Sequence, residues 1–183
     1  MSHTERHRGI PNAQSNSNLK QQFHCNNQNT IKGETVHMAK HISNMNELQK
    51  ALQPVMMGMA DKLAERVYET LNYFLQEYYD SYDPVSYRRT KDFLYSAVKV
   101  EPKIKGNKVI ASVYIDTDSM NNYYNATGHQ VATWANQGLH GGLATGGNTP
   151  RVWDDTMKET VNNGELLKLA MDYLKSKGFS VRM

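Results

Sequence analysis

Hydrophobic residues recur at every third or fourth position along a segment that begins just after Ser43, which is the spacing of one face of an amphipathic helix. Asn44, followed three residues later by Glu47, is typical of a helix N-cap. Pro54 removes a backbone donor and clashes with the preceding turn, so we expect a kink or a short break there. The repeating positions are Met45, Leu48, Leu52, Val55, Met56, Met59, Leu63, Val67, Leu71, Phe74, Leu75 and Tyr78.

The segment from Tyr78 to Val98 connects this helix to a region that alternates like β-strands. Asp83 precedes Pro84, which disfavours helical geometry, so we expect the long helix to end in this turn. The pattern then predicts a second, shorter helix from Ser86 or Tyr87 to about Ala97. Its core-facing residues would be Phe93, Leu94 and Ala97, and its outward-facing residues Arg88, Arg89, Lys91 and Asp92.

Alternating apolar residues from Ala97 to Ile104 and a β-branched run from Val109 to Ile115 predict an antiparallel hairpin. Gly106-Asn107 lies at the centre of the turn between them. Pro102 lies in the first arm, which indicates an edge strand or a bulge.

The segment from Asp116 to Thr149 contains six glycines and few apolar runs, and a long irregular segment of this kind is typically a functional loop. A short helix or strand is expected within it around Gln130 to Ala135, anchored by Val131 and Trp134. Two helices follow, at Arg151–Val161 and Glu165–Lys177, with Gly178 at the C′ position. Phe179 and Val181 would form a terminal strand or fray. Together these elements predict an α+β fold in which a long N-terminal helix and shorter helices pack on a small antiparallel β-sheet.

The N-terminal residues differ from the rest in composition. Ten of the eighteen residues from Asn12 to Asn29 are Asn or Gln, which leaves too little apolar surface to offset the entropy of ordering. Residues 1–40 are therefore expected to be a disordered leader or arm. Met38-Ala39-Lys40 has the form of a natural start, and Lys32-Gly33-Glu34 is compatible with a ribosome-binding site in the coding sequence. Translated upstream sequence is thus the alternative. Residues 41–183 are expected to form a single domain.

Charge and cysteine content narrow the function classes. The net charge is +3, and residues 38–183 carry only +1, which argues against a strongly basic DNA-binding domain. The single cysteine, Cys25, excludes an intrachain disulfide and favours a reducing, intracellular setting. No apolar run approaches the ~20 residues that a membrane span needs, so no membrane partner is expected.

Each candidate catalytic or metal-binding motif in the sequence lacks residues that the motif requires. Asp116-Thr117-Asp118 lacks the oxygen ligand and the glycine that an EF-hand loop needs at its fifth and sixth positions. His129 and His140 lie without a third ligand at a recognisable spacing. His140-Gly141-Gly142 resembles an oxyanion-hole segment, but a G-x-S-x-G nucleophile turn is missing, and the glycines are not followed by a P-loop G-K-[ST]. We therefore expect a protein that is not an enzyme and has no cofactor, metal site or catalytic residues.

The segment from Val85 to Ile115 holds seven basic residues against two acidic ones, a local net charge of +5. One interpretation is a face that contacts nucleic-acid phosphates, and the other is a solvated hairpin whose lysines protect an edge strand. Tyrosines near this segment could stack on bases or could form a helix-packing cluster. The candidate channel-facing or DNA-facing residues are Arg88, Arg89, Lys103, Lys105 and Lys108.

The order of elements and a few short motifs resemble the tail-completion, or neck, family of long-tailed bacteriophages, over about residues 40–178. Where the pattern of that family commonly has Arg-Thr-Gly, this chain has Arg89-Thr90-Lys91. The motifs that carry the resemblance are Tyr82-Asp83-Pro84, Tyr87-Arg88-Arg89-Thr90, Trp134-Ala135-Asn136-Gln137-Gly138-Leu139-His140-Gly141-Gly142 and Arg151-Val152-Trp153-Asp154-Asp155.

This resemblance implies a structural virion protein that forms a homo-oligomeric, six-fold ring at the head–tail junction. Its partners would be the head-side connector or stopper and the tail terminator or tail tube proteins, with double-stranded DNA passing through the ring. It would be assembled in the bacterial host cytoplasm and reside in the virion. The alternative is a nucleic-acid-binding accessory protein that uses the basic region 85–115. The candidate subunit or partner interface in the loop comprises His129, Trp134, Asn136, Gly138, His140, Gly141 and Gly142.

Overall fold

The longest element of the protein is helix α1, Met45–Asp80, in a computed structural model that describes residues 44–85, 88–121, 126–144 and 148–182. The side chain of Asn44 accepts a hydrogen bond from the Glu47 amide at 3.0 Å, which confirms the predicted N-cap. The predicted leader, residues 1–40, lies outside the described residues. The helix continues through Pro54, so of the expected kink or short break the break is wrong, while the kink stays a prediction. Pro54 and Lys50 are both exposed, and water can therefore satisfy the carbonyl group that loses its partner.

The predicted second helix does not form. Residues 88–91 have no regular secondary structure, a turn covers 92–95, and the next strand already begins at Ala97. Lys91 has a φ of 65°, which lies in the left-handed region and cannot continue a right-handed helix. Phe93 and Leu94 are buried as predicted, but a single turn is enough to bring these two consecutive residues to the core.

The predicted hairpin is confirmed as β1, Ala97–Lys105, and β2, Lys108–Ile115, paired antiparallel through a turn at Gly106. The register shifts between Val100 and Lys103, where Pro102 cannot donate to the ladder, so the predicted bulge is also confirmed. One face of the hairpin packs on α1. On that face Lys99 bonds to Asp61 at 2.8 Å and to Glu65 at 2.5 Å.

The glycine-rich segment contains α2, Gly128–Asn136, which settles the expected short element there as a helix. A capping box between Thr127 and Gln130 begins it. The C-terminal part comprises α3, Val152–Met157, the π-helical segment η1, Lys158–Asn162, and α4, Glu165–Ser176. Gly178 follows α4 with a φ of 87°, as predicted for a C′ glycine. Among the described residues no strand follows α4.

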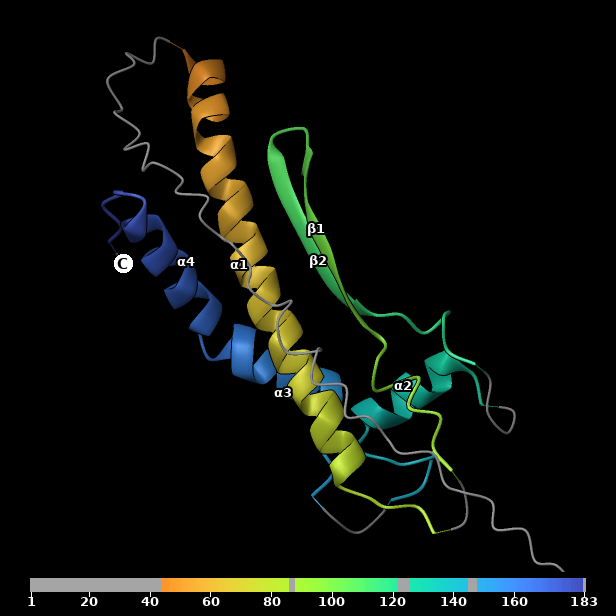
Figure 1. The fold of residues 1–183 in the computed structure, drawn as a ribbon. Coiled ribbons are helices and arrows are strands. Elements are labelled where there is room, and N and C mark those ends of the chain that lie inside the picture. Colours follow the sequence, from red (N-terminus) through yellow and green to blue (C-terminus); the bar gives the residue numbers. More distant parts are fainter. Residues whose placement is uncertain (1–43, 86–87, 122–125, 145–147, 183) are drawn as a thin grey trace, which may run out of the picture. The chain divides into compact units, whose positions relative to one another are not determined.

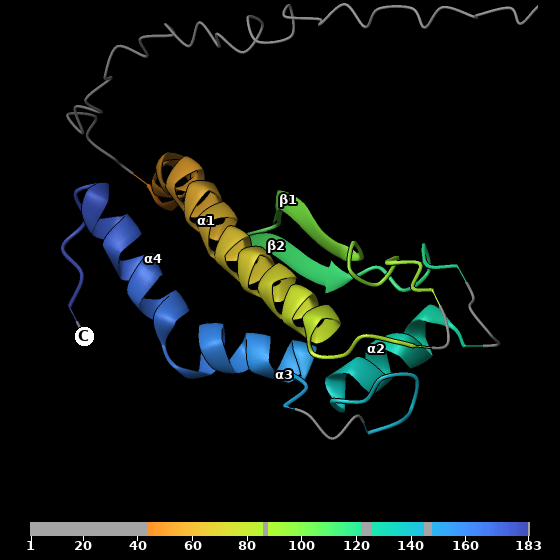
Figure 2. The same cartoon turned by 60° about the horizontal axis from the view of Figure 1, so that its bottom comes forward.

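The hydrophobic core joins the C-terminal half of α1 to the turn at 92–95, α2 and α3. Its buried members are Leu71, Leu75, Tyr78, Phe93, Leu94, Ala135 and Val152. The hairpin and the α3–α4 segment lie on opposite sides of α1 (Figures 1 and 2). The α+β prediction is confirmed, with a long N-terminal helix and a small antiparallel sheet.

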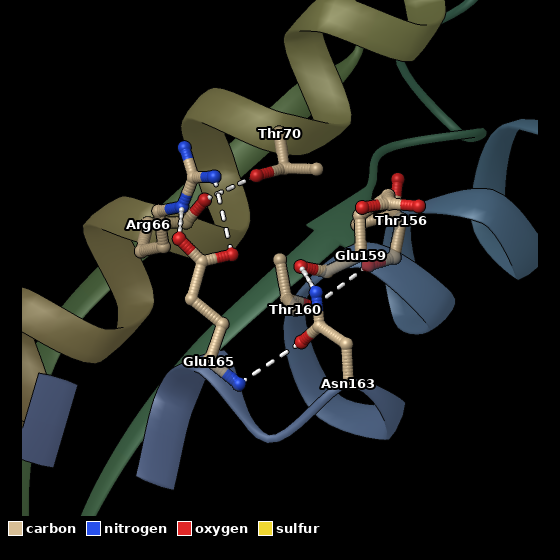
Figure 3. Close-up of polar contacts among 7 residues, drawn as sticks. All are labelled: Arg66, Thr70, Thr156, Glu159, Thr160, Asn163 and Glu165. Atoms are coloured by element: carbon tan, nitrogen blue, oxygen red, sulfur yellow. Dashed lines mark hydrogen bonds and ion pairs between the residues drawn. The ribbon is translucent and has the colours of Figure 1, made fainter. Parts of the chain in front are cut away.

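Helix α4 contributes no buried residue, and polar contacts fix its start against α1 (Figure 3). Glu165 receives two hydrogen bonds from the Arg66 guanidinium, at 2.9 and 3.2 Å. Asn163 accepts from the Glu165 amide at 2.9 Å and donates to the Glu159 carbonyl, which links the end of η1 to the start of α4. Further along, Gly58 lets α1 and α4 approach closely, since a Cβ there would lie 2.1 Å from the hydroxyl oxygen of Tyr173.

Candidate functional site

A cavity of about 470 Å³ lies where the end of α1, the loop after Arg88, α2 and the turn at 140–144 meet. This volume falls within the ~300–1,000 Å³ that is typical of small-molecule pockets. Rings form much of its wall, from Tyr78, Tyr79, Tyr82, Phe93, Trp134 and His140. We refer to this cavity as the aromatic pocket.

His140 forms one wall of the aromatic pocket and is only 7% exposed. Its ring stacks on Tyr78 with centroids 4.0 Å apart, and its Nε2 lies 3.1 Å from Ser81 Oγ. The amides and carbonyls of His140 and Leu143 exchange hydrogen bonds of 2.9 and 3.0 Å across a tight turn. Gly141 and Gly142 occupy that turn with φ values of 58° and 81°, a conformation that glycine adopts at little cost.

The environment keeps the His140 ring uncharged. Burial, and to a smaller extent the nearby Arg89 guanidinium, lowers the pKa of His140 from its ordinary 6.5 to about 4. The ring is therefore neutral at pH 7. It serves as a stacking and hydrogen-bonding surface there, without carrying charge.

Arg89 supplies the positive charge of the aromatic pocket. Its Cζ lies 5.1 Å from the centroid of the Tyr79 ring and 5.7 Å from that of Tyr82, which is the distance of cation–π contacts. Its Nη1 donates to the Tyr79 carbonyl, whereas its Nη2 is buried and has no hydrogen-bond partner among the described residues. Arg88 is exposed as expected, but Arg89 is half-buried among rings, so its predicted outward orientation is wrong. The predicted second helix does not form, and without it Arg88 and Arg89 do not lie on a common outward face.

The three candidate lysines of the hairpin come together. Lys105 pairs directly with Lys108, and Lys103 pairs with Ile110 two positions further along the same face. All three lysines are exposed. The structure therefore groups Lys103, Lys105 and Lys108 at the hairpin tip and separates them from Arg89. That any of the five candidate residues contacts DNA stays a prediction.

Several residues of the predicted interface loop make contacts with other parts of the same chain. Asn136 Oδ1 accepts hydrogen bonds from the amides of Trp153 and Asp154, at 3.0 and 2.9 Å, and so caps the start of α3. Trp134 packs against Gly142, where a Cβ would lie 3.4 Å from its ring.

Gly138 has a φ of 72° and turns the chain after α2, while His129 and Gly141 are exposed. An interface role for the loop residues stays a prediction.

The sequence did not reveal the pocket itself. In the sequence, the cluster of tyrosines was the only sign of the aromatic pocket. The contacts that form the pocket walls include hydrogen bonds to backbone groups. The Tyr78 hydroxyl donates to the Leu139 carbonyl at 2.7 Å, across 61 residues of chain. A hydrogen bond to a backbone carbonyl cannot be predicted from the periodicity of the sequence.

Two further observations concern the part of the chain that the structure describes. No group of three or more His, Cys, Asp or Glu side chains is placed to hold a metal ion. None of its helices has both the length and the apolar character that crossing a membrane requires.

Comparison with known proteins gave one finding. The family model described as YomN matches residues 44–176, which is most of the chain and includes all of the described helices and strands from α1 to α4. No curated protein and no solved structure matched the chain.

Proposed function

The chain belongs to the YomN family, a phage-associated family named after a gene of the Bacillus phage SPbeta region, and from this premise we propose that it is a structural virion protein of the head–tail junction. In this role it forms a homo-oligomeric ring, with six-fold symmetry, that joins the head-side connector or stopper to the tail terminator or tail tube. It turns over no substrate. The ring is assembled in the bacterial host cytoplasm and lets double-stranded DNA pass.

The observation that carries this proposal is the outer face of the hairpin, which we define as Val98, Val100, Ile110, Ser112 and Tyr114. These residues alternate with those that face α1, and Ile110 and Tyr114 are 43% and 45% exposed. Within the described residues, β1 and β2 pair only with each other, so each strand has one free edge. Lys103, Lys105 and Lys108 lie on the same face at the hairpin tip, and the part nearer the core is largely apolar. A largely apolar face with free strand edges is a typical template for pairing with another chain. A neighbouring subunit in a ring would cover it.

A phage that carries the gene provides the decisive test. A nonsense mutation should yield DNA-filled heads and separate tails, because neither part alone carries the joining ring. Addition of the purified protein to such a lysate should restore infectious, tailed particles, as should growth on a suppressor host. Electron microscopy and plaque counts measure both effects. Tailed particles at wild-type yield from the mutant without suppression would contradict the proposal.

The lysines at the hairpin tip favour a second candidate, a nucleic-acid-binding accessory protein. Lys105 and Lys108 lie directly opposite each other, which is unfavourable for the hairpin alone and would be relieved by a polyanion. In this case the isolated chain binds duplex DNA with an affinity that falls steeply with salt. Changing Lys103, Lys105 and Lys108 to Glu should abolish binding. The same change at Lys168, Lys175 and Lys177, which are exposed on or just after α4, is the matched control.

A further inference from the structure

Arg89, which lines the aromatic pocket, has an unmet hydrogen-bond donor in its guanidinium. Of the buried side-chain nitrogen and oxygen atoms in the described residues, Arg89 Nη2 is the one that lacks a partner. A buried donor without an acceptor costs about 1–3 kcal/mol, and more when the group is charged. An acceptor that a small rotation of the guanidinium brings into reach would therefore be favourable.

The charge of Arg89 is also not neutralised within the described residues. No carboxylate there lies within the 4.0 Å of an ion pair with its guanidinium. Asp92 is the acidic residue of the pocket wall, and its Oδ2 already accepts from the amide and the side chain of Asn121, at 3.2 and 3.1 Å. The neutral ring of His140 adds no positive charge at pH 7. Arg89 therefore favours an acceptor that carries negative charge.

The rest of the pocket favours an apolar group beside that acceptor. The rings of Tyr78, Phe93 and Trp134 and the side chains of Met120 and Val131 line it. Gly141 and Leu143 at its edge are exposed, and Leu143 is 72% exposed, so the cavity opens to solvent there. A group can enter from this side without displacing the core.

We propose that the aromatic pocket binds a carboxylate attached to an apolar or aromatic group, with the carboxylate on the Arg89 guanidinium and the apolar part among the rings. Arg presents paired donors in a planar fork that matches a carboxylate. A free aromatic acid and the C-terminal residue of a polypeptide both offer this chemistry. The proposal does not depend on the ring, because all of the residues named belong to one subunit.

Trp134 reports directly on occupancy, and the chain has only one other tryptophan, Trp153. In the full-length Trp153→Phe variant, N-acetyl-L-phenylalanine should produce a saturable change in Trp134 fluorescence. N-acetyl-L-phenylalaninamide has the same side chain without the carboxylate, and it should bind at least about tenfold more weakly, the factor that loss of one charge-assisted hydrogen bond gives. Equal affinity for acid and amide, or no saturable change with the acid at millimolar concentration, would overturn the proposal.

Two variants locate the site. Arg89→Gln should abolish the response, whereas Arg88→Gln, which removes the same charge from the exposed neighbour, should leave it unchanged. Because Arg89 also bonds to the Tyr79 carbonyl, Ala144→Phe provides an independent check by filling the pocket from its exposed edge. Thermal unfolding confirms that each variant is folded. Equal losses in Arg88→Gln and Arg89→Gln, or full binding in Ala144→Phe, would contradict the assignment.

The peptide Gly-Gly-Gly-Phe separates the two sources of the ligand. If the site accepts a polypeptide C-terminus, the peptide with a free carboxylate should bind at least as tightly as N-acetyl-L-phenylalanine, and its C-terminal amide about tenfold more weakly. If the site takes a free acid, the peptide should bind more weakly than the acid. A peptide amide that binds as well as the free peptide would overturn the carboxylate assignment.

Discussion

Lys91 adopts a backbone conformation that suits glycine. Its φ of 65° is the only positive value at a non-glycine position in the described residues. The left-handed conformation costs an L-residue roughly 1–2 kcal/mol. Glycine adopts this conformation at little cost.

Lys91→Gly should therefore raise the free energy of unfolding by about 0.5–1 kcal/mol, which is the strain relieved less the extra entropy of glycine in the unfolded chain. Lys91→Ala is the control because it removes the same charge but keeps the Cβ, and it should not be stabilising. Urea unfolding followed by circular dichroism measures both. The same change in both variants would show that the charge, and not the backbone, determines the effect.

His140 makes the fold sensitive to acid. Its pKa is lowered from 6.5 to about 4 in the folded protein, so the unfolded state takes up the proton first as the pH falls. Stability that is fully present above pH 6.5 is therefore lost progressively as the pH falls toward 4. The groups that face the ring are Tyr78, Tyr82, Ser81 and Arg89.

A His140→Gln variant should lose less stability than the wild type between pH 7 and pH 4.5, although it starts from a lower value. Chemical denaturation at several pH values provides the comparison, and carboxylates contribute equally to both proteins. NMR titration of the His140 ring should give a pKa well below 6.5. A ring that titrates at its ordinary pKa would refute this account.

At the scale of elements, the position of α4 against α1 depends more on close side-chain contacts than on fully buried residues. The apolar residues of α4 are at most half-buried, and its specific contacts with α1 are the Arg66–Glu165 pair and the close approach of Tyr173 to Gly58. Arg66 and Glu165 are both more than a third exposed, and pairs of this kind contribute little on their own. The contact at Gly58 is therefore the more specific constraint.

Gly58→Ala tests this contact. Alanine favours a helix over glycine by about 1 kcal/mol, but the new methyl group would lie 2.1 Å from the Tyr173 hydroxyl oxygen. The substitution should thus be destabilising in the wild type and at least about 1 kcal/mol more favourable when Tyr173→Phe removes that oxygen. A double-mutant cycle of unfolding free energies measures the coupling. Additive effects would mean that α1 and α4 do not touch at this point in solution.

At the scale of the whole molecule, the buried core is concentrated at the C-terminal half of α1, while the hairpin tip, the start of α1 and α4 lie outside it. The hairpin is supported on one face by α1 and leaves its outer face exposed. An isolated two-stranded sheet is marginally stable, so a neighbouring subunit would stabilise it further.

Tyr114→Asp should therefore prevent assembly of the proposed ring while changing the unfolding free energy of the chain by less than about 0.5 kcal/mol, the usual range for exposed sites. Tyr73→Asp is the matched control, since Tyr73 is also exposed, at 57%, but belongs to α1 and not to the hairpin. Analytical ultracentrifugation reports the assembly state. Normal rings from Tyr114→Asp would place the subunit interface elsewhere.

The elements that the sequence predicted well are those whose signals are local. The stripe from Met45 to Tyr78, the alternation of Val109–Ile115 and the position of Gly178 each follow from a fixed period or from a backbone preference. The prediction of a second helix was wrong because Phe93 and Leu94 are adjacent apolar residues and do not repeat at helical spacing beyond one turn. Their burial was predictable, but the backbone that achieves it was not.

By itself the sequence determined the α+β class, the long helix, the hairpin with its bulge at Pro102, and the terminal helices, because hydrophobic period and turn chemistry act over a few residues. Only the tertiary structure decided that Arg89 turns inward, that Asn136 caps α3 and that His140 is buried against Tyr78. These positions depend on contacts between segments many residues apart, many of them made by backbone carbonyls and amides. Every residue carries such groups, so sequence alone cannot single out the ones that meet.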